Sequence, residues 1–331
     1  MNPDEKVSQL GEFGLIDRIV ARLGSPSEGE LWSGDDAAVL RSPGEPLVFT
    51  TDVMVEDVDF DLDLCEGADI GFKAVAANAS DVAAMGGRPR HLVAALTLTG
   101  STSVRVVDGI ADGIADACER WRIDAVGGDV SEGKSLSLAV AMTGSVPARP
   151  VFRGGAVPGD RLCVTGSLGG AAGGLRALRA GLRGISPEGD RLVARQLRPA
   201  ARVGEGLQLA AAGANAMIDV SDGLLADLAH LLDASSVGCE VDVTAVPIDP
   251  DLNWLENRLE IDAAALALSG GEDFELLCAI PEGALDDAKS ALDQLGTPLT
   301  DLGVVSEGDR VVGPRRLEEW KTTGWEHLRP R

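Results

Sequence analysis

Short runs of β-forming residues alternate with longer runs of helix-forming residues along most of this chain. Each run must bury its apolar side against another element, so this alternation favours stacked layers of helix and sheet. The strand-like runs are 37–40, 47–51, 91–99, the residues around Val126, 136–146, 161–165, 216–220, 274–280 and 299–305. The helix-like runs are 13–23, 68–85, 104–121, a helix from GSLGGAAGG through Arg179, 223–232 and 282–295. The pattern predicts an α/β (α+β) fold, in which the strands around Val126 and 136–146 pair.

A proline- and glycine-rich segment, PARPVFRGGAVPGD, interrupts this pattern near the middle of the chain. Such composition is typical of a linker. The chain has 331 residues, which is enough for two domains of ordinary size. We therefore predict two α/β domains, over residues 1–148 and 149–331.

The charge and composition exclude several classes of partner. A formal net charge of −24 disfavours nucleic acid and anionic membrane as partners, because both require a basic surface. The chain has no run of 18 apolar residues and does not begin with a basic region followed by an apolar one, so we expect a cytoplasmic protein. Its five cysteines are scattered and form no C-x-x-C pair, so we expect reduced core residues.

Seven carboxylates stand at the ends of predicted elements, each beside small residues, and several directly follow an apolar strand. They are Asp35, Asp36, Asp52, Asp81, Asp129, Asp219 and Asp222. If they converge, each like-charged pair about 4 Å apart would cost roughly 4 kcal/mol at an effective dielectric near 20, so a cation would be required. All-oxygen ligands suit a hard ion such as Mg²⁺. The alternative is scattered caps and turns, with Asp222 as the N-cap of the helix that follows it.

Two glycine-rich stretches invite a phosphate-binding interpretation. GDVSEGKS, residues 128–135, fits the P-loop pattern, but the residues after Ser135 alternate and are rich in β-formers, so we expect a strand where a P-loop needs a helix. We expect Lys134 to lie in a solvated turn between two strands. The turn GSLGGAAGG lacks G-x-G-x-x-G spacing, and close packing of a helix on a strand explains its glycines better.

With these acids in view, the chain resembles the thiamine-monophosphate kinase family, within the superfamily of aminoimidazole ribonucleotide synthetase. The matching blocks, in family order, are GEFGLIDRI, GDDAAV, TTD, GFKAVAANASDVAAMGG, GGDVSEG, RGGAVPGD, VTGSLGGAAGGL, IDVSDGLLADL, LSGGEDFELL and the C-terminal WKTTGWEHL. They cover nearly the whole chain, and their combination is specific although no single block is.

The resemblance implies that this chain transfers the γ-phosphoryl group of ATP to thiamine monophosphate, directly and without a covalent enzyme intermediate. It implies two α/β domains, a homodimer formed through the N-terminal domains, Mg²⁺ as cofactor and ATP as co-substrate. The implied Mg²⁺ ligands are Asp36, Thr50, Thr51, Asp52, Asp81, Asp129, Asp219 and Asp222. The implied ATP contacts are Gly128, Asp129, Arg153 and Ser221, and the implied thiamine contacts are Glu272 and Trp325.

One position departs from the family pattern. The family commonly has a histidine seven residues after the aspartate of its T-T-D block, whereas this chain has Asp59 there. An acid at the substrate pocket could approach the cationic thiazolium ring but would repel the substrate phosphate, so Asp59 is a candidate substrate-binding residue of altered character.

Other functions fit the residues less well. Selenophosphate synthetase uses a reactive cysteine near its N-terminus, whereas the first cysteine here is Cys65, and the hydrogenase-maturation relative ends in a cysteine-bearing tail, whereas this chain ends HLRPR. Aminoimidazole ribonucleotide synthetase matches the set of blocks less closely. A Ca²⁺-binding module would need a D-x-[DN]-x-[DN]-G loop, and the acids here are instead spread along the chain.

Overall fold

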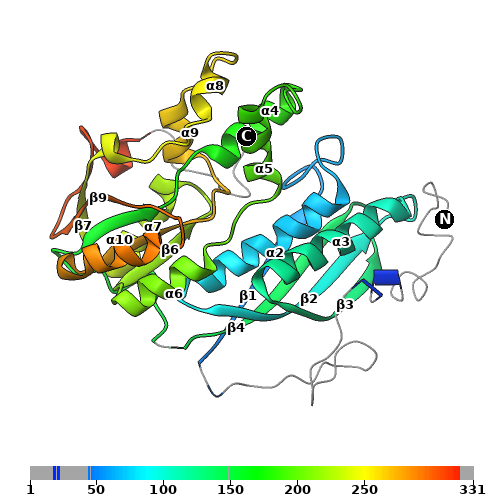
Figure 1. Cartoon of the computed structure of the whole chain (residues 1–331), viewed down its shortest axis with the longest axis horizontal. Helices are drawn as coiled ribbons and strands as arrows, with labels where there is room; N and C mark the ends of the chain where they lie inside the picture. Colours follow the sequence, from blue (N-terminus) through cyan, green and yellow to red (C-terminus); the bar gives the residue numbers. More distant parts are fainter. Residues whose placement is uncertain (1–17, 20, 23–43, 45, 148, 321–331) are drawn as a thin grey trace. The chain divides into compact units, whose positions relative to one another are not determined.

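The computed structural model describes residues 18–19, 21–22, 44, 46–147 and 149–320 (Figure 1). The predicted strand at 37–40 lies outside these residues, and the predicted helix at 13–23 lies largely outside them. The chain divides into two compact units, one of residues up to Val82 together with Arg88–Pro147, the other of Ala83–Gly87 and the residues after Pro147.

The first unit contains a four-stranded sheet in the order β1-β4-β2-β3. Its elements are β1 (Leu47–Val55), α2 (Gly67–Ala84), β2 (Arg88–Leu98), α3 (Val104–Trp121), β3 (Asp124–Glu132) and β4 (Ser137–Ser145). Only β2 and β3 run parallel to each other, and the other pairs are antiparallel. The predicted pairing of the strand around Val126 with that at 136–146 is wrong, because β2 lies between β3 and β4.

Helices α2 and α3 lie on the same face of this sheet (Figure 1). Alternate residues of β4 point to that face, and Leu138, Val140 and Met142 are accordingly buried. The other face carries exposed apolar side chains, and Leu47 and Phe49 are 64% and 69% exposed. The sheet is thus covered by helices on one face only in the described part of this unit.

Glycines allow α2 and α3 to approach each other closely. A Cβ added at Gly113 of α3 would lie 2.0 Å from the Ala68 carbonyl oxygen, and one added at Gly71 of α2 would lie 2.1 Å from the Ile110 carbonyl oxygen. Both obstructing atoms belong to backbone and cannot turn aside. This spacing fixes how α2, which carries Asp81, lies on the sheet.

The second unit is built around a seven-stranded sheet in the order β11-β10-β7-β9-β5-β8-β6. Its strands are β5 (Arg161–Thr165), β6 (Ala216–Val220), β7 (Gly238–Val241), β8 (Glu275–Ile280), β9 (Leu299–Ser306), β10 (Arg310–Val312) and β11 (Arg315–Arg316). Its α-helices are α4 (Gly170–Arg179), α5 (Pro187–Leu197), α6 (Val203–Ala212), α7 (Leu224–Ser235), α8 (Leu252–Glu256), α9 (Ala263–Ser269) and α10 (Leu285–Asp293).

Helices cover both faces of the sheet at its β8–β6 end, and β6 and β8 are buried along their whole length. Ile218 and Leu277 pack with α7 in one core, whereas Met217 and Leu276 pack with α6 and α10 in another. Strands buried on both sides lose the polar alternation of a half-exposed sheet. The continuous apolar runs AMIDV and ELLCAI reflect this burial.

The glycine-rich stretch runs into α4, and its glycines within the helix serve close packing against other helices rather than against a strand as predicted. A Cβ at Gly174 would lie 2.0 Å from the Leu192 carbonyl oxygen of α5, and one at Gly173 would lie 2.4 Å from a methyl carbon of Leu252 in α8. The pattern could not distinguish these partners, because α5 and α8 were not themselves predicted.

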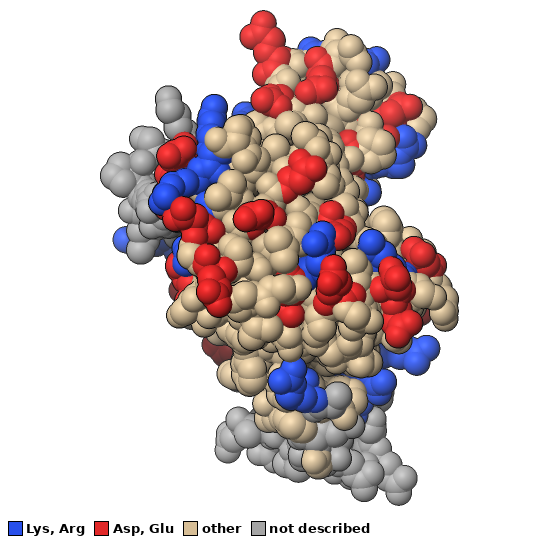
Figure 2. Space-filling model, turned by 90° about the vertical axis from the view of Figure 1, so that its left-hand side faces the viewer, with Lys and Arg blue, Asp and Glu red and all other residues tan. Residues whose placement is uncertain are grey.

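The charged side chains and the cysteines lie where the composition predicts, the first on the surface and the second in the core. Acidic and basic side chains are interspersed over the face of the molecule shown in Figure 2. All five cysteines are free and buried, which confirms the expectation of reduced core residues. Within the described ranges, no helix has the length and apolar character that crossing a bilayer requires.

The α2–α3 contact predicts a difference between two glycine-to-alanine variants. Gly113→Ala should lower stability by about 1–3 kcal/mol, because its methyl group meets backbone. Gly204→Ala, on α6, should leave stability equal or higher, because the nearest atom to its methyl group is a Leu295 side-chain carbon at 3.4 Å. Thermal unfolding measures both, and equal melting temperatures would contradict the packing argument.

Candidate active site

Asp52 and Asp81 form the acidic centre of the first unit. Asp52 lies on β1 and Asp81 on α2, and their carboxyl groups are hydrogen-bonded to each other. The Thr50 hydroxyl donates to Asp81 Oδ2 over 2.5 Å. Burial, and then repulsion by the Asp81 carboxyl, raise the pKa of Asp52 to about 6. Two carboxyl groups this close require a proton or a cation between them.

The structure does not bring the Thr51 side chain to this pair. Successive residues of a strand point to opposite faces, so Thr50 and Asp52 face α2 whereas Thr51 faces away. The Thr51 hydroxyl donates to the carbonyl oxygen of Val140 on β4 over 2.9 Å. Its place in the predicted ligand set stays a prediction.

Asp129 and Gly128 lie on β3, at the opposite edge of the same sheet. Asp129 is exposed and in register with Ala95 of β2, and two strands separate β3 from β1. Three strand spacings amount to about 14 Å, so the structure keeps Asp129 apart from Asp52 within this unit. Gly128 permits close approach to β2, because a Cβ there would lie 2.2 Å from the Ala94 carbonyl oxygen.

The connection from β3 to β4 settles the P-loop question. A strand, β4, follows it where a P-loop requires a helix, and Lys134 is exposed in the turn. Both features are as the sequence predicts. This turn lacks the geometry of a nucleotide-binding P-loop.

Asp59 holds the loop that follows β1. Its Oδ2 accepts the backbone N–H of Val55 over 2.8 Å, and its own N–H donates to the Val55 carbonyl oxygen. Asp57 in the same loop has a positive φ of 67°. The Asp59 carboxylate therefore stabilises its own loop. The histidine that the family commonly has at this position gives no hint of this role.

The end of β6 gathers three carboxylates in the second unit. Asp219 is buried in the strand, Asp222 follows it, and Asp227 lies one helical turn into α7. Asp227 Oδ2 accepts the backbone N–H groups of Ser221, Asp222 and Gly223, each over 3.1 Å. Burial, then the charges of Asp219 and Asp222, raise the pKa of Asp227 to about 8, against these N–H groups.

Asp227 therefore caps the turn that Asp222 was expected to cap. The N-cap of α7 is Gly223, and it makes no side-chain hydrogen bond to the helix. The N-cap interpretation of Asp222 is wrong, because the turn folds back over a carboxylate from within the helix. The one sequence signal for Asp227 is an acid in the first turns of a helix, where the helix dipole favours it.

The loop between α9 and β8 lies against this turn. The Glu272 N–H donates to the Ser221 carbonyl oxygen over 2.8 Å. Asp273 Oδ2 and Oδ1 accept the N–H groups of Gly169 and Ala171 at the start of α4. Burial raises the pKa of Asp273 to about 7, against those two N–H groups. The structure thus brings Glu272 beside Ser221, although 50 residues lie between them in the sequence.

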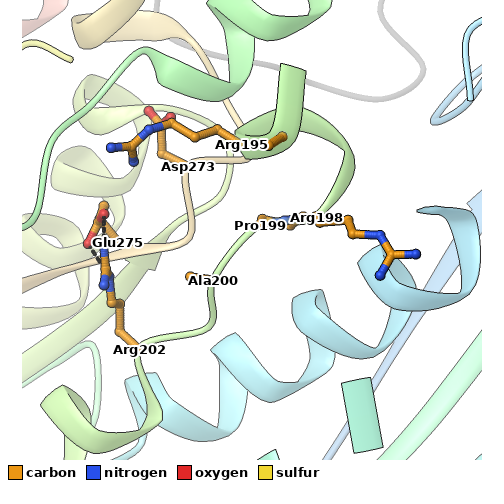
Figure 3. Close-up of a pocket in the computed structure, with 8 residues that line it drawn as sticks. Arg195, Arg198, Pro199, Ala200, Arg202, Asp273 and Glu275 are labelled. Atoms are coloured by element: carbon orange, nitrogen blue, oxygen red, sulfur yellow. Dashed lines mark hydrogen bonds and ion pairs between the residues drawn. The ribbon is translucent and has the colours of Figure 1, made fainter. Parts of the chain in front are cut away.

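A pocket of about 150 Å3 borders this loop (Figure 3). It is lined by Ala194, Arg195, Arg198, Pro199, Ala200, Arg202, Asp273 and Glu275. Arg202 pairs with the buried Glu275 through two nitrogens, at 2.5 and 2.7 Å, and Arg195 pairs with Asp249 at 2.5 Å. In Figure 3 Arg195 lies beside Asp273, and Arg198 extends in another direction.

Arg153 lies in the segment between Pro147 and β5 and is exposed. Its carbonyl oxygen accepts the Ser235 hydroxyl at the end of α7. Asp35, Asp36 and Trp325 lie outside the described residues. Among the residues that are described, no group of three or more Asp, Glu, His or Cys side chains is arranged to hold a metal ion.

Comparison with known proteins places this chain in a family. Residues 34–146 match the model for AIR synthase related protein, N-terminal domain, and 157–314 match that for its C-terminal domain. A thiamine-monophosphate kinase of Escherichia coli K12 is 39% identical over 301 residues, covering 88% of this chain and 90% of its own, and one of Aquifex aeolicus is 34% identical over 323 residues, covering 98% and 100%. This chain belongs to the thiamine-monophosphate kinase family.

Solved structures of thiamine-monophosphate kinases share the fold. That from Stenotrophomonas maltophilia K279a is 37% identical with a TM-score of 0.82, over 92% of this chain and 96% of the other. A structure described as AaThiL complexed with AMPPCP and TMP is 32% identical with a TM-score of 0.79, over 98% and 99%. The hydrogenase maturation protein HypE in complex with ATP, at 23% identity and a TM-score of 0.72, shares the fold alone.

The contrast between Lys134 and Asp129 can be tested in this member of the thiamine-monophosphate kinase family. Lys134→Ala should change kcat/KM by less than about tenfold, because the side chain lies in an exposed turn. Asp129→Asn should reduce turnover by orders of magnitude if Asp129 is the metal ligand that the sequence resemblance implies. Both are assayed at saturating Mg²⁺, with circular dichroism as a check of folding. An inactive Lys134→Ala beside an active Asp129→Asn would reverse the assignment.

Proposed function

We propose that this protein transfers the γ-phosphoryl group of ATP to thiamine monophosphate. A terminal oxygen of the substrate phosphate attacks the γ-phosphorus, the bond from that phosphorus to the β–γ bridging oxygen breaks, and thiamine diphosphate and ADP form. The in-line geometry needs no covalent enzyme intermediate. The similarity over 98% of the chain to a relative described with AMPPCP and TMP carries the proposal.

Three positions would contact ATP in addition to Asp129. Exposed Arg153 offers a fork of N–H donors suited to phosphate oxygens. Ser221 stands in the turn that Asp227 holds, so its backbone position is fixed before ATP binds. Gly128 presents a backbone without a side chain at the edge strand β3.

The acids fit a hard cation. Asp52 and Asp81 already share a hydrogen bond between two carboxyl groups, and Thr50 adds a hydroxyl, so the donor set consists of oxygens. The further ligands that the family resemblance implies are Asp36, Thr51, Asp129, Asp219 and Asp222. Mg²⁺ bound by these residues would neutralise charge on the transferring phosphoryl group.

The thiamine part would be held in the second unit. Glu272 presents a carboxylate that complements the positive charge of the thiazolium ring, and Trp325 would contribute an aromatic surface. Asp59 keeps a place among the substrate-binding residues, although its contact to Val55 gives it a structural role as well.

The open face of the four-stranded sheet supports a homodimer. Leu47, Phe49 and Val53 of β1 and Val93 of β2 are exposed on it, and an apolar surface of this kind is typical of an interface. We propose that two copies pair through this face. We also propose functional domains at 1–148 and 149–331 and a cytoplasmic location, which the five reduced cysteines support.

The proposed reaction predicts a product and a metal requirement. Purified protein incubated with ATP, Mg²⁺ and thiamine monophosphate should yield thiamine diphosphate, detected by chromatography. Chelation with EDTA should abolish the reaction and added Mg²⁺ should restore it, because the clustered carboxylates would bind phosphate only through a cation. Undiminished turnover under full chelation would rule out the metal role, and absence of product with Mg²⁺ would rule out the reaction.

The proposed dimer predicts a difference between two surface variants. Phe49→Asp should shift the protein from dimer to monomer in sedimentation experiments, because it places a charge in the centre of the apolar face. Leu295→Asp, an equally drastic change at an exposed leucine of the second unit, should leave the dimer intact. A monomeric wild type, or a dimeric Phe49→Asp, would contradict the proposal.

A further inference from the structure

The loop that carries Glu272 is held in an unusual backbone conformation. Glu272 and Phe274 have positive φ values of 68° and 51°, which residues with side chains adopt infrequently. Their N–H groups donate to the carbonyl oxygens of Ser221 and Val220, over 2.8 and 2.9 Å. Such conformations persist only where the surroundings impose them, and they concentrate at functional sites. The backbone of Glu272 is thus fixed, and a hydrogen-bond partner can also fix where its carboxylate points.

Gln196, in the last turn of α5, supplies that partner. It is 5% exposed, and its Nε2 donates to Glu272 Oε2 over 2.7 Å. A carboxylate accepts hydrogen bonds and does not donate them, so the amide nitrogen must face Glu272. The amide oxygen Oε1 then points elsewhere, buried and with no hydrogen-bond partner among the described residues.

The unpartnered oxygen helps to decide whether Gln196 serves stability alone or serves to hold Glu272. Buried polar groups are normally satisfied at both ends when they serve stability alone. An apolar side chain of similar length would fill the same space without leaving an acceptor unsatisfied. The bond to Glu272 is therefore the feature that requires an amide here.

The backbone of Gln196 is held firmly. A Cβ at Gly174 of α4 would lie 2.9 Å from Gln196 Cβ and 2.0 Å from the Leu192 carbonyl oxygen, so α4 and α5 are in close contact at this point. Ser186 caps the start of α5 by accepting the Gly189 N–H over 3.1 Å. A buried side chain on a rigid helix holds its partner in one place.

We propose that Gln196 is a positioning residue that orients the Glu272 carboxylate toward the cationic part of the substrate. The inference rests on the proposed function, in which Glu272 holds the thiamine part. Gln196 itself touches no reacting atom. We therefore expect Gln196 to affect substrate binding and not the phosphoryl-transfer step.

The first test replaces the amide with an apolar side chain of similar length. Gln196→Met should raise both KM and the dissociation constant for thiamine monophosphate about tenfold, the size expected for the loss of one hydrogen bond to a charged group. The KM for ATP and the melting temperature should stay at wild-type values. The matched control is Gln208→Met on the exposed side of α6, which should leave all of these unchanged.

The second test makes the interaction depend on pH. In Gln196→Glu the introduced carboxyl group can donate to Glu272 only while protonated, and repulsion by Glu272 raises its pKa above the usual value for glutamate. The affinity of Gln196→Glu for thiamine monophosphate should therefore be close to that of wild type at about pH 5.5, and it should fall below that of wild type toward about pH 8.5. The charged groups near this end of α5 are common to all variants, so the ratio isolates position 196; they are Arg195, Arg198, Arg202, Asp249, Asp273 and Glu275.

The outcomes separate this inference from the proposed function. Wild-type affinity for thiamine monophosphate in Gln196→Met, or a joint loss of melting temperature and ATP affinity, would overturn the positioning role. A flat pH ratio in Gln196→Glu would do the same. If wild type binds thiamine monophosphate without phosphorylating it, the proposed reaction fails, and the dissociation constants of the variants still decide the role of Gln196.

Discussion

Three backbone N–H groups converge on one oxygen of Asp227, and the arrangement of the second unit's functional residues depends on that carboxylate. These three hydrogen bonds hold the turn after β6, which carries Ser221 and Asp222. The Ser221 carbonyl oxygen in turn receives the Glu272 N–H. The turn and the loop therefore form one hydrogen-bonded assembly. One carboxylate oxygen in this position accepts three backbone N–H groups, which would otherwise be left without hydrogen-bond partners.

The same assembly explains why acids can be placed so close together. Asp219, Asp222 and Asp227 repel one another, and burial makes the charged forms costlier still. Backbone donors offset part of this cost at Asp227, whereas in the first unit a hydrogen bond joins Asp52 to Asp81. Both groups of acids therefore concentrate unfavourable charge, which is the reason that we propose a cation there. The energy that keeps them folded comes from the apolar cores beneath, with α7 on one face of the sheet and α6 and α10 on the other.

The first unit shows how strand geometry distributes candidate residues. Thr50 and Asp52 face α2, Thr51 faces away, and Asp129 lies across two intervening strands. A run of adjacent polar residues in the sequence is therefore not a cluster in space. The glycines of α2 and α3 matter here because they allow α2, which carries Asp81, to pack closely against α3.

Local patterns in the sequence determined much of the fold. The predicted helix at 104–121 and the predicted strands at 161–165 and 216–220 have the bounds of α3, β5 and β6, because apolar periodicity and flanking turn residues act over short distances. The strand after Ser135 and the exposed turn at Lys134 were likewise predictable. Family resemblance, carried by short blocks such as IDVSDGLL, singled out the acids and Glu272 as candidates, and their roles stay predictions. Only the tertiary structure decided that β2 separates β3 from β4, that Asp227 rather than Asp222 organises the turn, and that Gln196 meets Glu272. Those outcomes depend on contacts between residues far apart in the chain, and no local propensity encodes which distant backbone will come to lie beside a given side chain.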